Sequence, residues 1–364
     1  INRRQAELQP QKSYWVEALI IALAGFMLGG LPVWGSGRSS SVGMWSDRFT
    51  LAPLFGAAIL LVLAIDWLLH ERWKKFALLG LLVGLAFSLH IRTANQYMAD
   101  WDNQRDYYWQ LLWRAPGLKP NTAIIATRIP SGLLSKYSAG FIFNVLYDPT
   151  AQVKDVPYWY FTSNDIGGDV SSMEPNAPIK YTQLRNMNFK GNTSQSLVIT
   201  RPSNERCLWV VSPYLRDEGV LTYDEEEITS LSNPTQILAE STKPIPLDVV
   251  GSEPAHDWCY YFEKAELYNQ YQDWNTTVML WNDSQAQGLK PRNPAELTPF
   301  ILAFAQTNDW ENARRLSEQM QQTAPDRQPA MLCALWNYLK QEPPPSSERD
   351  AFLQSVDYAG LCTP

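Results

Sequence analysis

The residues best placed for nucleophilic chemistry are His256 and Cys259, which stand three positions apart beside Asp257 and Trp258. A cysteine activated by a neighbouring imidazole is a common nucleophile. The alternative, which we favour, is a helix-capping segment in which Cys259 is bridged to another cysteine. The chain contains no Gly-x-Ser-x-Gly, His-Glu-x-x-His, dinucleotide-binding or P-loop pattern. We therefore expect no catalytic residue and no cofactor within this chain.

All the cysteines fall in the last half of the chain and form one set of disulfide candidates: Cys207, Cys259, Cys333 and Cys362. In an oxidising compartment, four cysteines allow two disulfides with three possible connectivities. The alternative is four ordinary buried thiols. No Cys-x-x-Cys occurs and there are three histidines, so the sequence predicts no metal site.

The elements that position these residues begin with three apolar segments, at 14–34, 51–69 and 76–91. Each is near the span of roughly 17 to 25 residues that a helix needs to cross hydrocarbon. Basic residues in short loops favour the cytoplasmic side, and they precede the first segment and separate the second from the third: Arg3, Arg4, Lys12, Arg72, Lys74 and Lys75. Residues 1–13 are thus predicted to be cytoplasmic and the chain after residue 92 extracytoplasmic. Membrane lipid is an expected partner.

The predicted outer portion has four parts. Residues 93–120 are expected to form a juxtamembrane helix that continues the third span or bends along the surface, and 121–215 an α/β domain. Residues 216–254 read as a linker, and 255–364 as helices resembling tetratricopeptide repeats. The net charge of −7 argues against a nucleic-acid partner. The predicted fold class is therefore three transmembrane helices, an outer α/β domain and α-helical repeat-like C-terminal helices.

The repeat prediction comes from Asp273-Trp274 and Asp309-Trp310, which are offset by about one helix-turn-helix unit. A second motif enters the second apolar segment: Trp45-Ser46-Asp47-Arg48-Phe49-Thr50-Leu51-Ala52-Pro53-Leu54-Phe55-Gly56. It resembles the Asp-Arg-Tyr-Thr-Tyr-Leu-Pro-Leu-Ile-Gly segment of bacterial multi-spanning proteins that combine a GT-C type glycosyltransferase region with tetratricopeptide repeats. Phe49 replaces Tyr, and Leu51 and Ala52 interrupt the register.

The resemblance implies that Asp47 and Arg48 lie at the outer membrane face, where the guanidinium could hold the phosphate of a lipid-linked sugar. The alternative is an Asp-Arg pair that anchors the end of a helix. Members of that family place their catalytic acidic residues in an early outer loop that this sequence does not contain. The chain begins at Ile1 without an initiator Met, so we interpret it as part of a longer protein.

Two functions follow from these observations. The first is a polytopic membrane protein whose outer domain recognises a protein or glycan partner. The second is the acceptor-recognition end of a polyprenyl-phosphate-sugar-dependent glycosyltransferase with its catalytic residues upstream.

Overall fold

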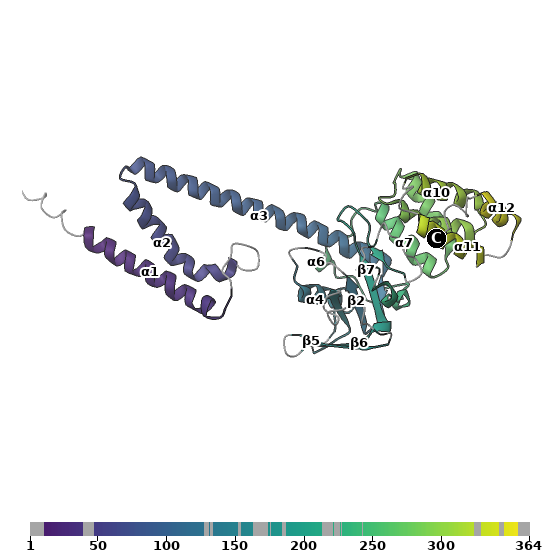
Figure 1. Ribbon diagram of the computed structural model, residues 1–364, viewed down its shortest axis with the longest axis horizontal. Helices are drawn as coiled ribbons and strands as arrows, with labels where there is room; N and C mark the ends of the chain where they lie inside the picture. The colour runs from purple at the N-terminus through teal and green to yellow at the C-terminus, as the bar shows by residue number, and fades with distance from the viewer. Residues whose placement is uncertain are drawn as a thin grey trace, which may run out of the picture. The chain divides into compact units, whose positions relative to one another are not determined.

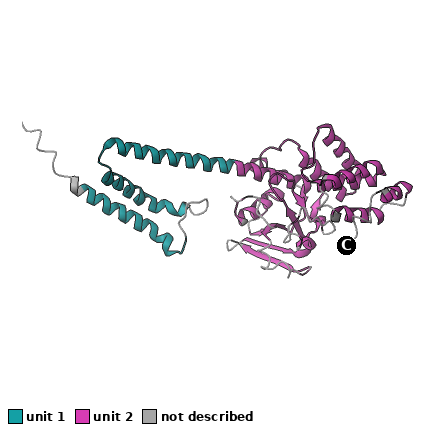
Figure 2. Ribbon diagram, turned by 45° about the horizontal axis from the view of Figure 1, so that its top comes forward, with its two compact units in different colours: residues 1–98 teal, residues 99–364 magenta. Residues whose placement is uncertain are grey.

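The fold was obtained as a computed structural model that describes most of the chain. The described residues are 11–38, 47–126, 131, 134–151, 154–162, 174, 176–183, 187–212, 221, 226, 228–241, 243–323, 329–341 and 346–355. They fall into two compact units, Ile1–Met98 and Ala99–Pro364 (Figure 2).

The first unit consists of long apolar helices (Figure 1). These are α1 (Gln11–Gly35), α2 (Leu51–Leu68) and the first part of α3 (Arg72–Arg114), with a 3-10 turn, η1 (Asp47–Thr50), before α2. Among the described residues, three segments have the length and composition to cross a membrane: Tyr14–Gly35, Arg48–Leu68 and Arg72–Arg114. The prediction of three candidate spans is therefore confirmed.

Small residues let α1 and α2 approach closely. A Cβ atom added to Gly56 would lie 2.2 Å from the backbone nitrogen of Phe26 and 2.4 Å from the carbonyl oxygen of Ala22. A Cβ atom added to Gly29 would lie 2.6 Å from the carbonyl carbon of Ala52. Close backbone contact at small residues is the usual way that helices associate in lipid. Gly56, the last residue of the quoted motif, is thus required by packing between the two helices.

Helix α3 is continuous over 43 residues and contributes to both units. Its last two turns carry buried residues that belong to the core of the second unit, including Tyr108, Leu111 and Leu112. The helix ends at Arg114, because Pro116 disfavours helical backbone in the residue before it. A short strand, β1 (Gly117–Leu118), follows.

The middle region is a mixed α/β fold, as predicted. Its main sheet has the order β4-β2-β7-β8, with β2 (Thr122–Ala126) parallel to both neighbours and β8 antiparallel to β7. The other strands of this sheet are β4 (Tyr158–Thr162), β7 (Ser196–Thr200) and β8 (Trp209–Val210). Helix α4 (Lys136–Tyr147) connects β2 to β4 and packs against β4. Ser135 caps this helix by accepting a hydrogen bond from the Ser138 backbone N–H.

A second sheet differs from the sequence prediction. The sequence from Lys180 to Phe189 by itself predicts one strand, but two antiparallel strands occupy the region, β5 (Pro178–Gln183) and β6 (Met187–Asn192). Strand β3 (Asp155–Val156) pairs in parallel with β6. The residues between β5 and β6 include neither Gly nor Pro, so the sequence carried no strong turn signal.

The predicted linker 216–254 also contains structure where it is described. Strand β9 (Ile237–Leu238) pairs antiparallel with β1, and a short helix, α6 (Leu247–Val250), follows. This segment belongs to the folded unit, because Ile237 and Val250 are both part of its hydrophobic core.

The C-terminal third is helical. Its helices are α7 (Trp258–Gln270), α8 (Trp274–Ala286), α9 (Thr298–Gln306), α10 (Trp310–Thr323), α11 (Pro329–Gln341) and α12 (Ser347–Ser355), with a 3-10 turn, η7 (Pro294–Leu297), before α9. Contacts join α7 to α8, α8 to α9 and α9 to α10, and α7 also contacts α9. The shared core includes Trp281, Phe300 and Trp336.

The two Asp-Trp motifs form the same turn. Gln272 and Asn308 each adopt a left-handed conformation, with φ of 61° and 62°. The backbone N–H of Asp273 donates to the Tyr268 carbonyl at 2.9 Å, and that of Asp309 donates to Phe304 at 2.8 Å. In both turns the aspartate side chain then accepts from the backbone N–H three residues later, so it caps the next helix.

Candidate functional site

The motif residues at the start of α2 lie next to a second arginine. Within the first unit, the guanidinium carbon of Arg48 lies 5.0 Å from the centroid of the Phe49 ring. The guanidinium carbon of Arg38, which follows α1, lies at the same distance from that ring. Asp47 begins the 3-10 turn η1, and its side chain lies outside the described part of the structure.

Two guanidinium groups on one aromatic ring concentrate positive charge at the end of the α1–α2 pair. The ring face attracts each cation, which orders the side chains. Arginine presents planar donors that match phosphate oxygens. The structure thus places Arg38, which the glycosyltransferase-like motif does not include, beside Arg48 of that motif.

Cys207 and Cys259 form a disulfide, with the two sulfurs 2.07 Å apart and the Cα atoms separated by 5.2 Å. Both side chains are fully buried. The bond joins the segment before β8 to the first turn of α7, beside the contact of the Trp209 and Phe262 rings at 4.8 Å. Cys333 is also disulfide-bonded, and Cys362 lies outside the described residues.

The bridged cysteine decides between the two interpretations of the His256 segment. The Cys259 sulfur is bonded to Cys207, so it cannot act as a thiolate next to His256. Asp257 is the N-cap of α7 and accepts hydrogen bonds from the backbone N–H groups of Cys259 and Tyr260. The expected capping segment with a bridged Cys259 is confirmed.

His256 itself belongs to an aromatic and acidic group at the surface. Its ring stacks on Tyr260 with centroids 3.5 Å apart and an interplanar angle of 2°. Its Nε2 atom lies 3.1 Å from Oε1 of Glu253, and that oxygen also accepts from the indole N–H of Trp113 at 2.8 Å. The imidazole is thus held in place by a ring face and a carboxylate, which ties the end of α3 to α7.

The same unit contains a buried charge cluster. Arg114 donates from Nη2 to Oε1 of Gln270 at 2.9 Å, and its Nε and Nη1 atoms have no hydrogen-bond partner among the described residues. Glu263 is fully buried, and both of its carboxyl oxygens also lack a partner there. Burial raises the pKa of Glu263 well above its ordinary value, while the Arg114 charge opposes that rise.

Burial also raises the pKa of the neighbouring Glu266, again opposed by Arg114. A carboxyl group without hydrogen bonds in a dry interior favours its protonated form. Sequence reasoning missed this cluster because charged residues on a helix usually face water. The available signal was spacing: Glu263 lies four residues from both Cys259 and Leu267, and both are buried.

Glu296 has a structural role. Its Oε2 atom accepts from the Trp258 indole N–H at 2.7 Å and from the backbone N–H groups of Arg292 and Asn293 at 2.7 and 3.1 Å. Burial raises the pKa of Glu296, and these hydrogen bonds oppose the rise. The carboxyl group completes a capping box with Asn293 at the start of η7.

The described residues contain no group of three or more His, Cys, Asp or Glu side chains that could hold a metal ion. No protein-family model, curated protein or solved structure matches this chain.

Proposed function

We propose that this chain is the membrane-anchored part of a recognition protein whose second unit lies outside the cytoplasm and binds a protein or a glycan. The observation that carries the proposal is the Cys207–Cys259 disulfide in the unit that follows three candidate membrane spans. Disulfides persist in oxidising compartments and are rare in the cytosol. The basic residues between α2 and α3 support the same orientation.

The binding role is supported by the helices after α6. The repeated turn at Gln272-Asp273 and Asn308-Asp309, together with the contact between α7 and α9, is what a tetratricopeptide-like array would produce. Such arrays commonly bind segments of partner molecules along their helices. We infer that α7 to α12 form a short array of this kind, packed on the α/β region through the Cys207–Cys259 bond.

Site-specific photo-crosslinking of the full chain in cells tests the recognition role. A photoreactive residue replaces Met279, whose side chain is 64% exposed on α8. The control replaces Tyr137, which is exposed on α4 of the α/β region. We expect a crosslinked protein or glycan from the Met279 position and none from Tyr137. Absence of any adduct at Met279, with normal expression, contradicts a partner on the helical array.

A second function is favoured by the two arginines on Phe49. In this alternative the chain is the acceptor-recognition end of a glycosyltransferase that uses a polyprenyl-phosphate sugar, and Arg48 with Asp47 contacts the lipid-linked phosphate. Arg48→Gln in the whole protein would then abolish binding of a polyprenyl phosphate, while Arg48→Lys would retain part of it. Unchanged binding in Arg48→Gln rejects this alternative and leaves the recognition role standing.

A further inference from the structure

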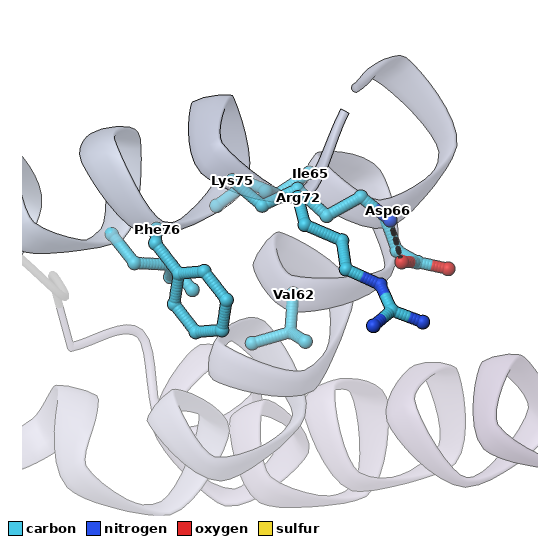
Figure 3. Close-up of a pocket in the computed structure, with 7 residues that line it drawn as sticks. Val62, Ile65, Asp66, Arg72, Lys75 and Phe76 are labelled. Atoms are coloured by element: carbon cyan, nitrogen blue, oxygen red, sulfur yellow. Dashed lines mark hydrogen bonds and ion pairs between the residues drawn. The ribbon is translucent and has the colours of Figure 1, made fainter. Parts of the chain in front are cut away.

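A pocket lies between α2 and α3 near the turn that joins them, within the first unit (Figure 3). Its volume is about 440 Å³, and it is lined by Val62, Ile65, Asp66, Arg72, Lys75, Phe76 and Leu79. This volume is within the range of roughly 300 to 1,000 Å³ that is typical of small-molecule sites. We call this pocket the α2–α3 wedge.

The charges of the wedge do not cancel. Lys75 forms an ion pair with Asp66, which is marked by the dashed line in Figure 3. Arg72 makes no ion pair or hydrogen bond with any residue that the structure describes. The wedge therefore carries one uncompensated positive charge beside apolar walls formed by Val62, Phe76 and Leu79.

The position of the wedge along the two candidate spans indicates that a lipid headgroup is the anion within reach. Trp67 and Trp73 flank the turn between α2 and α3, and their side chains are 69% and 66% exposed. Tryptophan is enriched at the depth of the lipid headgroups. The wedge also opens at the N-terminal end of α3, where the helix dipole favours negative charge.

We propose that the α2–α3 wedge binds one anionic phospholipid. Its phosphate contacts the Arg72 guanidinium, whose planar donors match phosphate oxygens. One acyl chain lies along Phe76 and Leu79, which otherwise leave apolar surface open. The proposal depends only on the membrane helices and stands or falls independently of the recognition role proposed for the second unit.

The test measures lipid binding to the purified full chain in detergent by native mass spectrometry. The probes are dioctanoyl phosphatidylglycerol, dioctanoyl phosphatidylcholine and inorganic phosphate. The variant is Arg72→Gln, and the matched control is Lys74→Gln, because Lys74 is two residues away, pairs with Glu71 at 3.0 Å and does not line the wedge. Arg72→Lys retains the charge but loses the planar guanidinium donors, and it is the test variant if Arg72→Gln fails to fold.

We expect one saturable phosphatidylglycerol molecule per chain. Arg72→Gln should weaken its binding about tenfold, the effect of losing roughly one charge-assisted hydrogen bond. Arg72→Lys should weaken it less, and Lys74→Gln should leave it within about twofold of the parent chain. Equal losses of phosphatidylglycerol affinity in Arg72→Gln and Lys74→Gln would show a diffuse charge effect and overturn the proposal. Equal binding of phosphatidylcholine, or displacement of phosphatidylglycerol by inorganic phosphate, would also overturn it.

Discussion

Removal of the Cys207–Cys259 bond should destabilise the second unit strongly. The bonded residues are 52 positions apart in the chain. A loop of this length corresponds to about 4 kcal/mol of stabilisation through restriction of the unfolded chain. For a unit of this size, each kcal/mol shifts the melting temperature by roughly 2 to 4 °C. The expected loss on Cys207→Ala is therefore about 8 to 16 °C.

Thermal unfolding of the full chain in detergent, followed by tryptophan fluorescence, measures this loss. Cys207→Ala, Cys259→Ala and the double variant are compared, because each of them removes the same cross-link. All three should lose about the same stability, within roughly 1 kcal/mol. Additive losses in the double variant, or a shift of less than about 2 °C, would refute the cross-link as the source of the stabilisation.

Four further substitutions test the packing, the electrostatics and the helix caps. Gly56→Leu should separate α1 from α2, because even a Cβ atom would meet Phe26 backbone at 2.2 Å, and it should abolish a disulfide engineered between these helices. The pKa of Glu263 is raised in the folded state. The protonated carboxyl group therefore contributes to the stability of the fold below the ordinary pKa of glutamate, and this contribution is lost as the pH rises through the pKa of the folded state. Glu263→Gln should therefore flatten the fall in melting temperature above about pH 4.5; a fall as steep as in the parent chain would contradict this. Asp273→Ala and Asp309→Ala each remove a helix cap and should each cost about 1 kcal/mol in chemical denaturation; unequal losses would contradict equivalent turns.

The membrane helices were predictable because their signal is composition over a long window. Residues such as Leu61 and Val83 lie in runs long enough to cross hydrocarbon without any knowledge of tertiary contacts. The turns before Trp274 and Trp310 were also visible, since the Asp-Trp pairs repeat at a fixed offset. In both cases the information is local in the sequence.

Features that depend on tertiary contacts were not predictable. Four cysteines allow several pairings, and the sequence alone did not select Cys207 with Cys259. The burial of Glu263 depends on the end of α3 packing against α7, which is set by contacts more than a hundred residues apart. The hairpin of β5 and β6 was predicted as one strand because no Gly or Pro separates its arms.

The position of the second unit outside the cytoplasm is the central claim, and labelling of engineered cysteines tests it most directly. Met279→Cys places a thiol on exposed α8, and His70→Cys places one in the exposed turn between α2 and α3. A membrane-impermeant maleimide should label Met279→Cys in intact cells or spheroplasts, and it should label His70→Cys only after lysis. Labelling of His70→Cys in intact cells, with Met279→Cys protected until lysis, would place the second unit in the cytoplasm and contradict the proposed function.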